Sequence, residues 1–311
     1  MTFNHPPRHF FDEQMSIELD ALTRALQRDS TVRAVVFTGT DSTYLTHFHV
    51  PSLLAGASTV PWEIGYRPAR AVAAMARLAV KSRHVDAVLS RTAARDTLFL
   101  ARTYAALDRL SRLDQVVITA INGMALGMGA IFALACDIRI MADDTKIGLV
   151  ESGLEILAGA SGTQRLTRTV GSGVAIELLL EGRWLTATDA EQLRLVQHVR
   201  SRGQLLATAT ETAERLAGRS PALTREVKRA VYDAGTRPST AGLGREAAST
   251  IRTLTTAAAR RALSSYSDYL ASHEPLTDEV ILHAWGPLLG HTSAHADTAT
   301  GDQPNPTDPV R

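Results

Sequence analysis

The chain has 311 residues, and 45% of them are hydrophobic, which is ample for a large buried core. Its 33 basic and 32 acidic side chains nearly cancel, so no overall field draws the protein to nucleic acid or to an anionic membrane. The single cysteine excludes a disulfide framework and favours the reducing cytoplasm, and no segment reaches the ~18 uncharged apolar residues of a membrane span or shows a signal peptide.

The first third of the chain predicts helices around one buried strand. Apolar residues recur at helical spacing over residues 17–26, and residues 32–37 form the apolar, β-branched run typical of a strand. Residues 55–113 are rich in Ala, Leu and Arg, which favour helices. Within this region, helices are expected at residues 69–80, 85–89 and 97–113.

A glycine-rich turn stands near the centre of the sequence. Residues 116–121 are short and apolar enough to form a strand buried on both faces. Gly127 and Gly129 then bracket Met128 directly before residues 130–136, whose apolar composition and few β-branched residues favour a helix. A strand, a turn and a buried helix are therefore expected to follow one another here.

Such a turn is suited to hold an anion. Glycines let the backbone approach a ligand closely, and the unpaired N–H groups of the first helical turn point outward with the positive end of the helix dipole behind them. The dinucleotide and P-loop patterns are both absent from this segment. Two interpretations remain: an oxyanion site, in which backbone amides stabilise charge on a carbonyl oxygen, or a turn needed only for packing.

The second half of the chain alternates short strands with helices. Strands are expected at residues 138–142 and 147–150, and Glu151 follows the second of them directly. Thr188, with Glu191 three residues later, has the spacing of a helix start. A last strand is expected at residues 196–199, and helices at residues 163–170, 174–180, 203–218, 221–234 and 245–270.

Three blocks of residues stand in a characteristic order. They read STVRAVVFTGTDSTYL, AINGMALGMGAIFALACDIRIMADDTKIGLVE and GASGTQRLTRTVGSGVAIELLLEGRWLTATDAEQLRLV. In residues, order and spacing these blocks resemble the crotonase, or enoyl-CoA hydratase/isomerase, superfamily, and the resemblance extends from about Phe3 to about Ser272. It implies an α/β fold with a crotonase-like ββα spiral core and a C-terminal helical region.

The resemblance also implies how the chain is divided. Residues 1–200 would form the ββα core, with residues 55–113 as an enlarged helical insertion that either borders the acyl pocket or forms an enlarged surface helix pair. Residues 201–289 would form a helical region that assembles homotrimers or homohexamers. Residues 290–311 are polar and proline-bearing, which predicts a disordered tail.

Two backbone amides would form the oxyanion site of such a protein. Family members usually place Gly-Ala-Asp after the strand that corresponds to residues 32–37, and the alanine amide is the first donor. Here Phe48 takes the alanine position and His49 the aspartate position. A backbone N–H does not depend on its side chain, so the donor can survive the change. The second donor would be the amide of Met128, and the residues expected beside the substrate are Gly127, Gly129, Ile131 and Gly159.

Glu151 is the catalytic base that the resemblance implies. Hydratases of the family carry a further glutamate early in the central helix, where this chain has Ile131. An isoleucine cannot move protons, and a positioned acid or base is worth ~10²–10⁴ in rate, so the two-carboxylate hydratase mechanism cannot operate in its usual form. Isomerases of the superfamily rely mainly on the glutamate that aligns with Glu151, which favours double-bond isomerisation of an acyl-CoA thioester through an enolate.

His47 and His49 leave alternatives open. Both titrate near neutrality, so either is a candidate catalytic acid, base or hydrogen-bond donor, although a structural or exposed role is also open. They lack a third ligand at a recognisable spacing, so no metal is expected. The alternatives are a specialised hydratase, hydrolase or decarboxylase that uses these histidines, or a non-catalytic acyl-CoA-binding protein. An acyl-CoA, or a carrier-protein thioester, is expected as substrate, with no cofactor.

Overall fold

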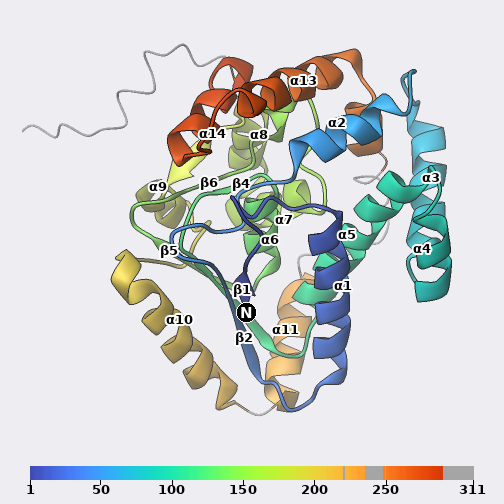
Figure 1. The fold of residues 1–311 in the computed structure, drawn as a ribbon. Helices are drawn as coiled ribbons and strands as arrows, with labels where there is room; N and C mark the ends of the chain where they lie inside the picture. Colours follow the sequence, from blue (N-terminus) through green and yellow to red (C-terminus); the bar gives the residue numbers. More distant parts are fainter. Residues whose placement is uncertain (220, 235–247, 249, 290–311) are drawn as a thin grey trace, which may run out of the picture.

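A five-stranded, entirely parallel sheet forms the centre of the computed structural model, which describes residues 1–219, 221–234, 248 and 250–289 (Figure 1). The strand order is β1-β2-β3-β5-β8. The bounds are Thr2–Phe3 for β1, Ala34–Gly39 for β2, Val116–Ile121 for β3, Ile138–Ala142 for β5 and His198–Arg200 for β8.

A second, three-stranded sheet lies beside the first. Its central strand, β6 (Lys146–Gly148), pairs in parallel with β4 (Ala125–Leu126) and antiparallel with β7 (Trp184–Thr186). The predicted strands at residues 116–121 and 138–142 are confirmed at those bounds, and those at 147–150 and 196–199 are confirmed with shifted ends. These strands could be predicted from the sequence because each is an apolar run between turn residues.

The central strand β3 is buried on both faces, as its continuous apolar run predicts. Val116, Ile118 and Ala120 face α10 (Arg202–Ala217), which crosses one side of the sheet (Figure 1). Val117 and Ile121 face the larger core, which contains α6 (Met128–Ala135). The sheet therefore separates a thin layer under α10 from the side that carries the glycine-rich turn.

Helix α1 (Glu13–Arg28) lies along α5 (Arg95–Ser111) on the side of the larger core (Figure 1). The carboxylate of Asp12 caps α1 by accepting a hydrogen bond from the Met15 amide at 2.9 Å. Arg109 of α5 donates to Asp20 Oδ1 at 3.0 Å and so ties the two helices together. This frame holds α5 in place, and one face of α5 borders the pocket described below.

The predicted helices between residues 55 and 113 are confirmed. They are α3 (Tyr66–Ala79), α4 (Arg83–Leu89) and α5, and the unpredicted α2 (Val50–Ser58) precedes them. The buried guanidinium of Arg102 makes paired hydrogen bonds of 2.9 and 3.0 Å to Asp86, which anchors α4 to α5.

The first two helices that follow the central segment agree with the prediction, and the third differs at its start. The bounds are Gly162–Val170 for α7, Ser172–Glu181 for α8 and Ala187–Gln192 for α9. The start predicted at Thr188 is wrong, because Thr186 ends β7 and caps α9 in a reciprocal pair with Asp189.

The C-terminal helices pack on the same chain. Helix α11 (Pro221–Ala234) is confirmed. The prediction of one continuous helix at residues 245–270 is wrong, because the chain turns at Thr255 and Thr256 caps a new helix, α13 (Ala257–Ala271). Helix α13 lies over α2 (Figure 1). Helix α14 (Asp278–Trp285) was not predicted and precedes a short turn of helix at Pro287–Leu289. Residues 245–247, 249 and the predicted tail at 290–311 lie outside the described residues. Assembly through residues 201–289 stays a prediction, and within the described residues no helix is both long and apolar enough to span a membrane.

Candidate active site

The glycine-rich turn joins β4 to α6 and allows three segments to meet. Gly127 has φ of +51°, and its amide donates to the carbonyl of Gly148 at 2.8 Å. A Cβ at Gly127 would lie 3.1 Å from Glu151 Oε1 and 3.6 Å from the Phe48 ring, so this position requires glycine for its conformation and offers little room for a side chain. At Gly129 a Cβ would lie 1.9 Å from the carbonyl oxygen of Leu45.

Glu151 lies at the first position of a short 3₁₀ turn, Glu151–Leu154, close behind β6. Its side chain is only 2% exposed, and neither carboxylate oxygen has a hydrogen-bond partner among the described residues. Burial disfavours the charged form and raises the pKa of Glu151 to about 7, and this effect outweighs a contact with the residue's own backbone that lowers the pKa. A carboxyl group with this pKa can both take and return a proton near neutral pH.

The amide of Phe48 is left free by its neighbours. Phe11 donates its N–H to the His47 carbonyl at 2.7 Å and accepts from the His49 N–H at 2.8 Å. Because successive amides of an extended segment point to opposite sides, the Phe48 N–H points away from Phe11. No described residue accepts a hydrogen bond from it, and the same holds for the amide of Met128, the first residue of α6.

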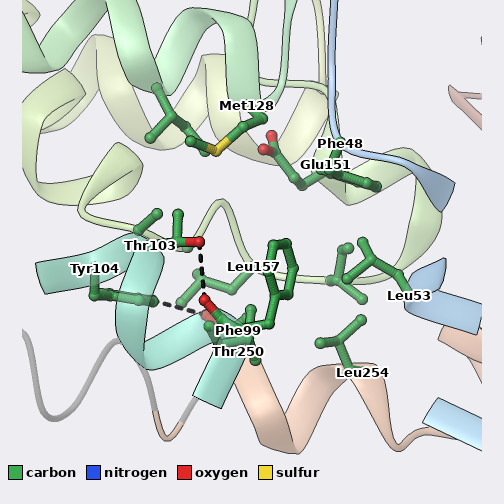
Figure 2. Close-up of a pocket in the computed structure, with 15 residues that line it drawn as sticks. Phe48, Leu53, Phe99, Thr103, Tyr104, Met128, Glu151, Leu157, Thr250 and Leu254 are labelled. Atoms are coloured by element: carbon green, nitrogen blue, oxygen red, sulfur yellow. Dashed lines mark hydrogen bonds between the residues drawn. The ribbon is translucent and has the colours of Figure 1, made fainter. Parts of the chain in front are cut away.

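An apolar pocket of about 60 Å³ opens in front of these groups. Figure 2 shows the Glu151 carboxylate pointing toward Met128 with Phe48 beside it, while Phe99 and Tyr104 lie on the opposite side. Its lining residues are Phe48, Leu53, Phe99, Leu100, Thr103, Tyr104, Met128, Ile131, Glu151, Ile156, Leu157, Gly159, Ala160, Thr250 and Leu254.

Most of the predicted site residues meet at this pocket. Phe48, Met128, Ile131, Glu151 and Gly159 all line it, although they come from distant parts of the sequence. The predicted Gly127 and Gly129 do not line it and instead shape the turn behind it.

The individual residues of the opposite wall were not predicted from the sequence, although the expectation that residues 55–113 border a pocket includes those from α5. Thr103 and Tyr104 come from α5, and Thr250 and Leu254 come from the segment before α13. The Tyr104 hydroxyl lies 3.2 Å from Thr250 Oγ1, so the two parts of the wall contact each other (Figure 2). Ordinary helix residues of this kind carry no sequence signal of a site.

His47 and His49 lie elsewhere. His47 is buried, with Nδ1 2.5 Å from the Phe48 carbonyl and Nε2 2.6 Å from the Tyr266 hydroxyl. Burial lowers the pKa of His47 to about 4. His49 is partly buried, and its Nδ1 lies 2.7 Å from Ser52 Oγ. Neither imidazole lines the pocket, so the geometry gives no support to the predicted catalytic role of either.

Among the described residues, no group of three His, Cys, Asp or Glu side chains is arranged to hold a metal ion.

Comparison with known proteins places the chain in a family. A family model described as enoyl-CoA hydratase/isomerase matches residues 84–273, which is more than half of the chain. The chain belongs to the enoyl-CoA hydratase/isomerase family. The matched range includes Met128, Ile131 and Glu151, whereas the segment around Phe48 lies before it.

Individual members of the enoyl-CoA hydratase/isomerase family are similar over part of their length. YngF of Bacillus subtilis, which carries the name of an enoyl-CoA hydratase/isomerase, is 39% identical over 54% of this chain and 64% of its own. The short-chain-enoyl-CoA hydratase of Clostridium acetobutylicum is 39% identical over 40% of this chain and 47% of its own. The chain thus spans less than two thirds of these relatives.

Solved structures of the family support the fold. The enoyl-CoA hydratase of Bacillus halodurans superposes with a TM-score of 0.69, over 85% of this chain and 94% of that chain. Its sequence is only 17% identical, so the likeness extends to the fold alone.

Proposed function

We propose that this protein isomerises the double bond of a short acyl-CoA thioester through an enolate, with Glu151 as the only base. The observation that carries the proposal is the state of Glu151. It is buried, it has no hydrogen-bond partner among the described residues, and its pKa is raised to about 7. A buried carboxyl group with a perturbed pKa in a pocket is typical of a catalytic base, since a structural carboxylate would have partners.

The reaction would begin with the thioester oxygen accepting hydrogen bonds from the Phe48 and Met128 amides. Glu151 would then remove a proton from carbon 2 of a 3-enoyl thioester; the electrons of that bond would form a double bond between carbons 1 and 2, and the carbonyl π electrons would move onto the thioester oxygen. As the enolate collapses, Glu151 would return the same proton at carbon 4. The double bond moves from carbons 3 and 4 to carbons 2 and 3, and no water is consumed. Removing one oxyanion donor costs other enzymes ~10²–10³ in rate, which is the scale expected of each amide here.

The small number of acidic residues along the pocket argues against hydration. Glu151 is the only carboxylate among the described residues that line it, and Ile131 closes the side where hydratases of the family carry their further glutamate. Hydration needs one group to activate water and another to deliver a proton, whereas isomerisation uses one base twice. The small volume of the pocket, about 60 Å³, further favours a short, unbranched acyl group.

The test compares wild type with Glu151→Gln on short 3-enoyl-CoA substrates. Conjugation of the double bond with the thioester is followed by ultraviolet absorbance, and binding is measured by calorimetry. We expect the rate to fall by ~10²–10⁴, while the dissociation constant of the acyl-CoA changes little, because glutamine keeps the shape of the side chain.

Other outcomes would refute the proposal. Conversion of 2-enoyl-CoA into 3-hydroxyacyl-CoA faster than isomerisation would make the protein a hydratase. A large loss of activity in His49→Ala would indicate a histidine-driven enzyme. Binding of acyl-CoA without turnover by the wild type would indicate a non-catalytic binding protein.

A further inference from the structure

The hydrogen bonds of His47 have a definite direction. A carbonyl oxygen only accepts, so the 2.5 Å contact with the Phe48 carbonyl requires a proton on Nδ1 of His47. The imidazole is neutral at ordinary pH, because burial lowers its pKa to about 4, and a neutral ring carries one proton. Nε2 therefore accepts a hydrogen bond from the Tyr266 hydroxyl at 2.6 Å. Burial also raises the pKa of Tyr266, so that hydroxyl keeps its proton.

The partners of His47 come from the C-terminal helices. Tyr266 belongs to α13 and Trp285 ends α14, and both side chains are fully buried at 0% exposure. The Trp285 ring stands edge-on to the His47 ring with the centroids 6.0 Å apart, and the Tyr266 and Trp285 rings are 4.7 Å apart. Phe10 covers His47 with a centroid distance of 4.6 Å. The imidazole is thus enclosed by aromatic rings, and these rings together with its two hydrogen bonds hold it in one orientation.

These contacts restrict the backbone of Phe48. The bond from His47 Nδ1 to the Phe48 carbonyl closes a small ring that spans both backbone dihedral angles of Phe48. Phe11 holds the peptide groups on either side, through the His47 carbonyl and the His49 amide. With three neighbouring backbone groups bound in this way, the direction of the Phe48 N–H is determined by its surroundings.

We propose that His47 and Tyr266 form a buried clamp that positions the Phe48 amide as an oxyanion donor. His47 is then a positioning residue and not an acid or base. The inference rests on the proposed function, because the amide matters only if a thioester oxygen binds there. It also gives the C-terminal helices a role at the site, since Tyr266 reaches the clamp across 219 residues of sequence.

Preorganised donors are effective because they need no reorientation as charge develops on the substrate. Loosening the Phe48 backbone should therefore weaken stabilisation of the enolate more than binding of the substrate. Loss of a whole donor costs ~10²–10³ in rate, and a donor that is present but mobile should cost less, about tenfold to a hundredfold.

The test compares Tyr266→Phe with Tyr44→Phe. Both substitutions remove a tyrosine hydroxyl that is fully buried and hydrogen-bonded, because the Tyr44 hydroxyl lies 2.6 Å from Thr119 Oγ1. We expect both variants to lose similar thermal stability, and only Tyr266→Phe to lose kcat, by about tenfold to a hundredfold, with KM within about twofold. His47→Asn keeps a donor at the Nδ1 position, so it should retain more activity than His47→Ala.

An infrared measurement separates the clamp from the function. The thioester carbonyl of a bound, isotopically labelled 2-enoyl-CoA should absorb at lower frequency on the wild type than in solution, because two amides polarise it. The downshift should be smaller on Tyr266→Phe and unchanged on Tyr44→Phe. An unchanged kcat and downshift in Tyr266→Phe would overturn the clamp. A wild type with neither turnover nor downshift would overturn the proposed function, and the clamp with it.

Discussion

Replacing Glu151 by glutamine should stabilise the folded chain at neutral pH while it removes the proposed activity. The carboxylate is buried, and neither oxygen has a hydrogen-bond partner among the described residues. Ionising such a group inside the protein costs free energy, since the unfolded chain would leave the same charge in water. Glutamine has nearly the same shape and never ionises, so it avoids this cost.

The size of the effect follows from the pKa of Glu151. Burial raises that pKa from 4.5 to about 7, so the folded state holds the proton more tightly than the unfolded state. The stability contributed by the protonated carboxyl is fully present below pH 4.5 and is lost as the pH rises through about 7. At ~1.4 kcal/mol for each pKa unit, the loss over this window is about 3 kcal/mol.

Urea unfolding at a series of pH values, at one protein concentration, measures this difference. We expect the free energies of unfolding of wild type and Glu151→Gln to be close at about pH 4.5, and the variant to gain about 3 kcal/mol over wild type by about pH 8. Glu155→Gln removes an exposed carboxylate nearby and is the matched control. A difference between wild type and Glu151→Gln that does not change with pH would refute the reasoning.

Two further predictions follow from the same groups. The rate of isomerisation should rise with pH and level off above an apparent pKa of about 7, because Glu151 acts as a base only when ionised; a flat pH–rate profile would contradict this. Gly127→Ala should lower the free energy of unfolding by about 1–2 kcal/mol and reduce the rate, because the residue has φ of +51° and its Cβ would press on Glu151. Gly203→Ala, in α10 with open space around it, should leave the rate unchanged and serves as the control.

Features set by local residue patterns could be predicted from the sequence. The bounds of β3 and β5 are confirmed, and Glu151 lies close behind β6 as its apolar run indicates. Local patterns also mislead, because Thr188 has the spacing of a cap, yet β7 occupies the chain up to Thr186 and moves the true cap there.

Features that depend on docking could not be predicted. The pairing of His47 with Tyr266 joins residues 219 positions apart and exists only because α13 packs over α2. In the sequence, two histidines at positions 47 and 49 suggested a catalytic acid or base. The structure instead shows His47 as an enclosed side chain with both ring nitrogens hydrogen-bonded. Helix α14 was missed for a related reason, because it is a short helix whose buried residues, such as Trp285, contact distant parts of the fold.

The place of Tyr266 and Leu254 in the chain has a consequence for synthesis in the cell. Ribosomes release residues in order, and the central sheet up to β8 is complete before the segment that closes the pocket has emerged. A nascent chain that ends before Thr250 would contain Glu151 and both amides, yet it would lack the part of the far wall formed by Thr250 and Leu254, and it would lack Tyr266, the partner of His47. The proposed activity would therefore require docking of the C-terminal helices, which are synthesised after the strands of the central sheet.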